Sequence, residues 1–143
     1  MQIKVIRMNG IELPKYETIG SAGMDVRANI KEPITLAPGV IKLIPAGLKV
    51  EIPLGYELQV RPRSGLALKH GLGMANSIGT IDSDYRGEIG VIAINFSDKL
   101  YTIQPEERIA QLVLNKVEQI EWVEVTELGT TERGAGGYGH TGK

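Results

Sequence analysis

Cysteine is absent from this chain of 143 residues. Its absence excludes disulfides, zinc sites built on thiolates and thiol nucleophiles, and it is compatible with a reducing cytoplasm. Only two histidines are present, so neither a histidine metal triad nor a serine triad is readily assembled. Any redox or hydrolytic chemistry must therefore use other groups.

Long apolar runs and an excess of one charge are also missing. No uninterrupted apolar run approaches the roughly 20 residues that a membrane-spanning helix needs, and Met1 to Lys4 lack the apolar core of a signal peptide. We therefore expect a cytoplasmic protein. A net charge of -1 gives no basic footprint for nucleic acid, and the length suits a single domain.

Short apolar segments rich in β-branched residues alternate with turn formers such as Ala37-Pro38-Gly39 and Pro53-Leu54-Gly55. One brief helix is predicted over Ser64 to His70. The pattern predicts an all-β fold, and connections of varying length favour a jelly roll over a sandwich or a barrel. The predicted strands are Ile3 to Ile6, Val40 to Ile44, Gly47 to Ile52, Tyr56 to Val60, Ile89 to Phe96, Ile109 to Val117 and Ile120 to Val125.

The pattern breaks after residue 125, because the glycines that follow cannot fill a core. We expect a β domain over 1–125 and an arm over 126–143. The last eleven residues, RGAGGYGHTGK, match two phosphate-binding patterns in part, but only four residues follow Gly139, which leaves no room for the helix that both require. Backbone amides with Arg133 and Thr141 favour a phosphate flap. A disordered terminus is the alternative, and Tyr138 argues against it.

Two further clusters carry chemical groups. GTIDSDYRGEIGV, over 79–91, concentrates Asp82, Asp84 and Glu88, and a carboxylate near a reacting phosphorus can accept a proton from the attacking water; acidic turn residues of a hairpin are the alternative. RPRSGLALKHG, over 61–71, combines arginines with a hydroxyl and glycine amides, which suits phosphate oxygens. Its alternative is a solvated turn with Ser64 as helix N-cap.

Five segments together, in this order along nearly the whole chain, resemble the signature of the trimeric dUTPase family. The resemblance implies a jelly-roll subunit, a homotrimer and three active sites at subunit interfaces, each closed by the arm of a neighbouring chain. It also implies Mg²⁺-assisted hydrolysis of dUTP to dUMP and pyrophosphate, which would limit uracil in DNA and supply dUMP for thymidylate synthesis. The five segments are AGMDVRA (22–28), RPRSGLALKHG (61–71), GTIDSDYRGEIGV (79–91), ERIAQLVL (107–114) and RGAGGYGHTG (133–142).

The same resemblance assigns roles to single residues. Asp82 would activate the water that attacks the α-phosphorus, and Asp25 would hold Mg²⁺ through its water shell. Tyr85 would pack on the sugar and exclude a 2′-hydroxyl. Arg108 would brace the site. Phosphate contacts are implied for Arg63, Ser64, Gly65, Gln111, Arg133, Gly139, His140 and Thr141, and uracil contacts for Asn76, Gly79, Thr80, Ile81, Gly90 and Tyr138.

Two positions differ from the commonest family pattern, because Tyr138 stands where phenylalanine is usual and His140 where serine is frequent. Tyrosine can still stack on a base. Two other functions are weighed against the first. A dCTP deaminase would need a carboxylic acid near the exocyclic amine of the base, and a non-catalytic β module would be expected to lack Asp82 or the arm.

Overall fold

Eleven strands and one helix make up the part of the chain that the computed structural model describes, residues 1–137. This confirms the all-β prediction and the helix α1 (Ser64–His70). No helix among these residues is long and apolar enough to cross a membrane. The strands are β1 (Lys4–Arg7), β2 (Met24–Arg27), β3 (Ile34–Leu36), β4 (Ile41–Pro45), β5 (Leu48–Glu51), β6 (Tyr56–Pro62), β7 (Leu72–Met74), β8 (Gly79–Ile81), β9 (Gly90–Asn95), β10 (Tyr101–Ile103) and β11 (Arg108–Lys116).

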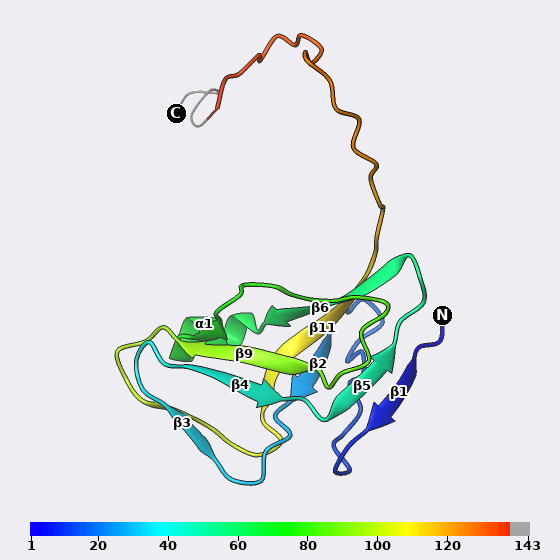
Figure 1. Cartoon of the computed structure of the whole chain (residues 1–143). Helices are drawn as coiled ribbons and strands as arrows, with labels where there is room; N and C mark the ends of the chain where they lie inside the picture. The colour runs from blue at the N-terminus through cyan, green and yellow to red at the C-terminus, as the bar shows by residue number, and fades with distance from the viewer. Residues whose placement is uncertain (138–143) are drawn as a thin grey trace.

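The strands form four antiparallel sheets around one core (Figure 1). The largest has the order β2-β11-β6-β8, the next β4-β9-β7, and the pairs β1-β5 and β10-β3 complete the body. Along β6 the buried Leu58 and Val60 alternate with half-buried polar residues, as expected for a strand with one face on the core. The buried polar side chain Asn95 is satisfied, because its amide donates to two carbonyls and its oxygen accepts from Ser97.

Strand β6 sets the geometry of the whole region. It pairs with β11 along its length, and with β8 through Leu58–Ile81 and Val60–Gly79. The helix α1 begins two residues after β6 ends, and it stops at Gly71, where φ is +66° and the amide donates to the carbonyl of Ala67 at 3.0 Å. Only glycine adopts this left-handed conformation at little cost. Because α1 follows the end of β6, the helix and the start of β6 lie at opposite ends of the body (Figure 1).

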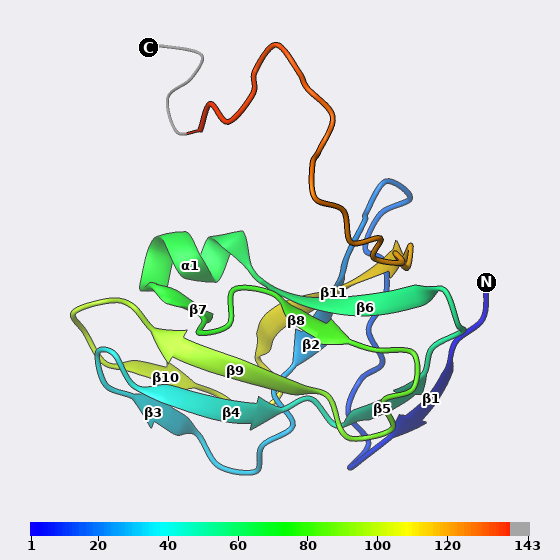
Figure 2. The same ribbon diagram turned by 45° about the horizontal axis from the view of Figure 1, so that its top comes forward.

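The chain after β11 differs from the sequence prediction. The strand expected over Ile120 to Val125 is not formed, and residues 117–137 have no regular secondary structure. This segment leads away from the body (Figure 2), so it has no neighbouring strand with which to exchange hydrogen bonds. Val117 is half-buried, and the large apolar side chains that follow it are exposed: Ile120, Trp122, Val123, Val125 and Leu128.

Candidate active site

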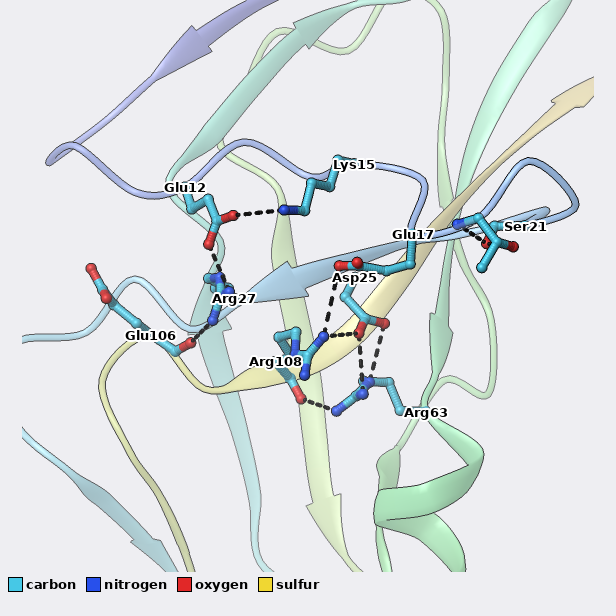
Figure 3. A network of polar contacts seen from close by, with 10 residues as sticks. Glu12, Lys15, Glu17, Ser21, Asp25, Arg27, Arg63, Glu106 and Arg108 are labelled. Atoms are coloured by element: carbon cyan, nitrogen blue, oxygen red, sulfur yellow. Dashed lines mark hydrogen bonds and ion pairs between the residues drawn. The ribbon is translucent and has the colours of Figure 1, made fainter.

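A carboxylate held between two arginines forms the first part of the site (Figure 3). Asp25 on β2 receives Arg63 in a bidentate contact, with Nε to Oδ1 and Nη2 to Oδ2 both at 3.1 Å. Arg108 approaches the same carboxylate, with Nη1 3.4 Å from Oδ2, and its carbonyl accepts from Arg63 Nη1 at 2.9 Å. Asp25 and, at 3.8 Å from Arg108, Glu17 balance the two positive charges, and the guanidinium N–H groups that remain free of them can donate to an anion.

The two arginines differ in how firmly they are held. The Arg63 guanidinium donates along one edge to the Asp25 carboxylate and through Nη1 to the Arg108 carbonyl. Its side chain is only 28% exposed. Arg108 is 44% exposed and has only longer contacts, to Asp25 and, at 3.8 Å, to Glu17. Weak contacts at an exposed side chain cost little to exchange. Arg108 is therefore the arginine that can turn most easily towards a bound phosphate.

Polar groups of other segments surround this arginine cluster, which we define as Asp25, Arg63, Ser64, Gly65, Arg108 and Gln111. Ser64 and Gly65 begin α1, where helix geometry leaves amide N–H groups without intrahelical acceptors, and Ser64 is exposed. Gln111 on β11 lies opposite Asp25 in the register of the sheet. The structure thus places Asp25 in one region with the site residues predicted from RPRSGLALKHG (61–71) and from ERIAQLVL (107–114).

Ion pairs fasten the segment before β2 over the same sheet edge. Arg27 contacts Glu12 at 2.6 Å and donates to the carbonyl of Glu106 at 2.9 Å, while Lys15 lies 3.7 Å from Glu12 (Figure 3). Thr18 and Ser21 close the turn between them with a side-chain hydrogen bond of 3.0 Å. Exposed pairs of this kind each stabilise by about 1 kcal/mol at most, so they order the segment more than they stabilise the fold.

The second part of the site is a hollow of about 300 Å³ beside β8. Its glycines permit close approach: a Cβ on Gly90 would lie 2.6 Å from Leu43 Cδ1, and one on Gly79 would lie 3.2 Å from Asn76 Nδ2. Glu88 of the predicted acidic cluster also lines it, together with Leu43, Val60 and Ile92, which the sequence did not single out. The predicted residues that share this β8 hollow are Asn76, Gly79, Thr80, Ile81, Asp82, Tyr85 and Gly90.

The loop after β8 presents Asp82 and Tyr85 to the hollow. The Tyr85 amide donates to the Asp82 carbonyl at 3.1 Å, and Arg86 braces the turn by donating to the carbonyls of Ser83 and Tyr85. The Asp82 side chain is exposed at the hollow's rim. A carboxylate on a braced loop can accept a proton from a water molecule bound beside it.

Asp82 at the β8 hollow and Ser64 in the arginine cluster lie at opposite ends of β6 within one chain. Ile81 pairs with Leu58 near the start of β6, whereas Arg63 follows its end. Leu58 and Arg63 are five positions apart, which corresponds to roughly 17 Å along a strand. Asp82 and Ser64 of the same chain therefore cannot touch one phosphate together.

A tyrosine and a glutamate lie beside the end of α1. The Tyr101 hydroxyl donates to the carboxylate of Glu107, which also accepts from the Gln104 amide at 2.8 Å. The His70 ring packs on Tyr101 with ring centroids 5.3 Å apart. Burial, and then the hydrogen bond and charge of Glu107, raise the pKa of Tyr101 well above its usual range. No sequence pattern indicated the contact of Glu107 or of His70 with Tyr101.

The described residues contain no group of three or more histidine, aspartate or glutamate side chains placed to hold a metal. The single carboxylate of Asp25 fits a different arrangement, because Mg²⁺ keeps several waters and takes its other ligands from substrate phosphates. Carboxylate oxygens have about four lone-pair positions, so Asp25 can accept hydrogen bonds from metal-bound waters beside its arginines.

The arm contributes less to the observed geometry. Arg133 lies on the segment that leaves the body, and its Nε donates to the carbonyl of Gly136 at 2.8 Å. It is not brought to either part of the site within this chain. Tyr138, Gly139, His140 and Thr141 lie outside the described residues.

The comparison with known proteins identifies a family that spans nearly the whole chain. The model of the dUTPase family matches residues 9–142. Deoxyuridine 5'-triphosphate nucleotidohydrolase of Fusobacterium nucleatum is 68% identical over 143 residues, covering 100% of this chain and 98% of that protein. The enzyme of the same name from Chlamydia pneumoniae is 64% identical over 135 residues, covering 94% and 93%.

A solved structure shows the same architecture. The dUTPase of Staphylococcus bacteriophage 80alpha, solved with dUPNHPP, has a TM-score of 0.89 and 26% sequence identity, and the match covers 99% of each chain. The predicted jelly roll is thereby confirmed.

Proposed function

This chain belongs to the dUTPase family and is a dUTP diphosphatase, which hydrolyses dUTP to dUMP and pyrophosphate; we propose that each of its active sites is assembled from more than one chain. The observation that carries the proposal is the distance between the arginine cluster and the β8 hollow along β6. Asp82 and Ser64 are both proposed to act on the phosphates of one nucleotide, and their separation in one chain supports a site in which the cluster of one chain faces the hollow of another.

A homotrimer with three shared sites satisfies this requirement and closes on itself. Further support comes from residues 117–137, which leave the body and expose Trp122 at 87% and Leu128 at 86%. Exposed apolar area costs about 25 cal/mol per Å², so such a segment is expected to be covered. Contact with a neighbouring chain would cover it and would carry Arg133 to that chain's site.

In the proposed site the β8 hollow holds the nucleoside. Asn76 and the backbone of Gly79 to Ile81 and of Gly90 would read the edge of uracil, and the ring of Tyr85 would pack on the deoxyribose. A Cβ on Gly90 would lie 2.6 Å from Leu43 Cδ1, so only glycine lets the backbone lie this close to the wall of the hollow. Selectivity would thus come from shape as well as from hydrogen bonds.

The arginine cluster of the facing chain would bind the triphosphate. Ser64, Gly65 and Gln111 would donate to phosphate oxygens, while Arg63 is oriented by Asp25 and Arg108 adds a cation. Donors placed where charge develops stabilise the transition state. Bound Mg²⁺ would supply further charge neutralisation on the phosphates, and Asp25 would hold its water shell.

Asp82 would take a proton from the water that attacks the α-phosphorus, and pyrophosphate would leave on the opposite side. The arm of a neighbouring chain, with Arg133, Tyr138, Gly139, His140 and Thr141, would close over the nucleotide and exclude other water. We place this reaction in the cytoplasm, where deoxynucleoside triphosphates are consumed during DNA synthesis.

The experiment that tests shared sites combines two inactive variants. Asp82→Asn removes the proposed base and Ser64→Ala a proposed phosphate donor; both side chains are exposed or at a rim and have no hydrogen bond in the described structure. Separately each variant should lose most activity. Unfolding and refolding them together should restore activity, because some sites then receive Asp82 from one chain and Ser64 from another.

Three samples serve as controls: each of the two variants unfolded and refolded alone, and the two variants mixed without unfolding. If one chain supplied both residues to each site, the mixed refolding would recover nothing. Pyrophosphate release from dUTP is the measurement, and light scattering reports the assembly formed.

A further inference from the structure

We propose that Glu88 is a positioning residue that holds Tyr85 in the orientation needed to reject ribonucleotides. The inference rests on the proposed function, in which Tyr85 packs on the sugar. Its basis is that Glu88 is bonded at both ends, with its carboxylate on the body of the protein and its backbone carbonyl on Tyr85. We call this pair of bonds the Glu88 latch.

The carboxylate end is attached to a fixed point. Glu88 Oε1 accepts the amide of Gly47 at 2.8 Å. Gly47 is buried in the turn between β4 and β5, with φ at +69°, and a Cβ there would lie 2.8 Å from Asn29. A buried amide without an acceptor is costly, so the carboxylate satisfies Gly47 and ties the loop after β8 to it.

The backbone carbonyl of Glu88 is oriented by the peptide group that links Glu88 to Ile89. The Ile89 amide donates to the Leu48 carbonyl at 2.8 Å. Since N–H and C=O of a trans peptide point in opposite directions, the Glu88 carbonyl is turned away from β5. There it accepts the hydroxyl of Tyr85 at 3.0 Å. The tip of the Tyr85 ring is therefore fixed through Glu88 to two neighbouring positions, Gly47 and Leu48.

Close packing completes the restraint. A Cβ on Gly87 would lie 2.2 Å from the Tyr85 hydroxyl, so the ring lies directly over Gly87 and is blocked on that side. Its other side faces the β8 hollow. A ring held at its tip and backed by the chain cannot give way to an extra 2′-hydroxyl on the sugar, and a loosened ring can.

Three variants separate the reach of the side chain from its charge. Glu88→Gln keeps an oxygen at the same reach, Glu88→Asp keeps the charge but shortens the side chain, and Glu88→Ala removes the acceptor. The ratio of kcat/KM for dUTP to that for UTP is the measurement. We expect it to fall about fivefold or more in the Asp and Ala variants, the effect of about one lost hydrogen bond, and to stay within about twofold of the unaltered protein in the Gln variant.

Glu51→Ala is the matched control. Glu51 lines the surface beside Arg86 of the same loop, and its carboxylate pairs with Lys4 rather than with any part of the latch. Its loss removes a negative charge near the loop and should leave the ratio unchanged. A fall in this control as large as that in Glu88→Ala would overturn the proposal, because it would assign the effect to charge alone.

Tyr85→Phe tests the other end. It removes the hydroxyl that Glu88 holds, so it should lower the ratio by a similar factor, and adding Glu88→Ala to it should lower the ratio by less than about twofold more. Full additivity would show that Glu88 does not act through Tyr85. If Glu88→Ala proves too unstable to purify, Glu88→Asp and Tyr85→Phe, alone and combined, give the same answer.

Failure of this inference can be told from failure of the proposed function. An unaltered protein that cleaves dUTP and UTP equally well would contradict the sugar contact of Tyr85. An unaltered protein that prefers dUTP, with folded Glu88→Ala and Glu88→Asp variants that prefer it equally, would overturn the Glu88 latch alone. Retention in Glu88→Asp with loss in Glu88→Gln would overturn it as well.

Discussion

Asp25 and Arg63 meet through two parallel contacts of 3.1 Å, although 37 residues separate them in the sequence. Arg108 adds a third contact to the same carboxylate. Arg63, beside the proposed phosphate position, is thus oriented before any nucleotide binds. Pre-orientation of this kind lowers the cost of binding.

Asp25→Asn should weaken this arrangement, because a neutral amide cannot balance two guanidinium groups. We expect the free energy of unfolding to fall by about 1–3 kcal/mol and more Mg²⁺ to be needed for half-maximal activity. Glu17→Gln, which loses only a contact of 3.8 Å to Arg108, is the matched control and should change either quantity little. Denaturant unfolding and Mg²⁺ titration check both. Equal behaviour of the two variants would refute the special place given to Asp25.

Asp82→Asn should bind dUTP nearly as tightly as the unaltered protein and lose most turnover. The expected fall in kcat is about 10² to 10⁴, the usual contribution of a general base. Single-turnover kinetics and calorimetry with a non-hydrolysable dUTP analogue separate chemistry from binding. An ordinary kcat in this variant would contradict the role assigned to Asp82.

Deletion of residues 133–143 should preserve the assembly and collapse activity. The described contacts of Arg133 are local to its own segment, so the body of the chain does not depend on it for folding. Sedimentation or light scattering measures the assembly, and pyrophosphate release measures activity. Loss of the assembly on truncation would show that the arm serves structure instead.

Chelation should remove activity without unfolding the protein. Residues 1–137 contain no cluster of ligating side chains that would make a metal part of the fold, so Mg²⁺ is expected to enter with the nucleotide. Treatment with EDTA should therefore lower turnover strongly and leave the melting temperature within about one degree. A large drop in melting temperature would point instead to a structural metal site.

Tyr101 should make stability fall at alkaline pH. Its pKa is raised in the folded chain, mainly by burial and then by Glu107, whereas the unfolded chain has the usual value of about 10. Below that pH both states keep the proton and no stability is lost. Above it the unfolded state releases the proton first, so stability falls as pH rises.

Melting temperatures measured between about pH 8 and pH 11 check this expectation. Tyr101→Phe cannot ionise and should lessen the alkaline drop, although its stability at neutral pH falls with the lost bond to Glu107. Tyr16→Phe changes an exposed tyrosine and should keep the drop of the unaltered protein. Identical pH profiles for all three proteins would exclude Tyr101 as the cause.

Much of the fold could be predicted from local sequence patterns. The alternation of apolar and polar residues located β6, and Ser64 to His70 formed the predicted helix with unchanged bounds. The strands missed were short: β2 has four residues, and β3, β7, β8 and β10 have three each. Such segments become strands through their neighbours in the sheet, and a local pattern does not contain that information.

The segment Ile120 to Val125 shows the opposite error. Its apolar and β-branched residues favour a strand, yet a strand requires a partner for its backbone. The body of this chain offers none beside it, so the segment stays irregular. Propensity alone could not reveal where a partner would be.

The candidate site divides in the same way. Family motifs indicated most of the residues that line the β8 hollow and the arginine cluster. The roles of Glu88 and Glu107 depend on contacts with Gly47 and Tyr101, which are distant in sequence or carry no distinctive pattern. Such roles become visible only when side-chain directions are known.

The length of β6 also has a genetic consequence in an assembly built as proposed. A chain with an inactivating substitution at one end of β6 inactivates one site. A chain with substitutions at both ends inactivates two sites, since its two ends contribute to different sites. Doubly altered copies should therefore be more strongly dominant over the normal gene product than either single alteration, and two singly altered alleles in one cell should partly rescue each other.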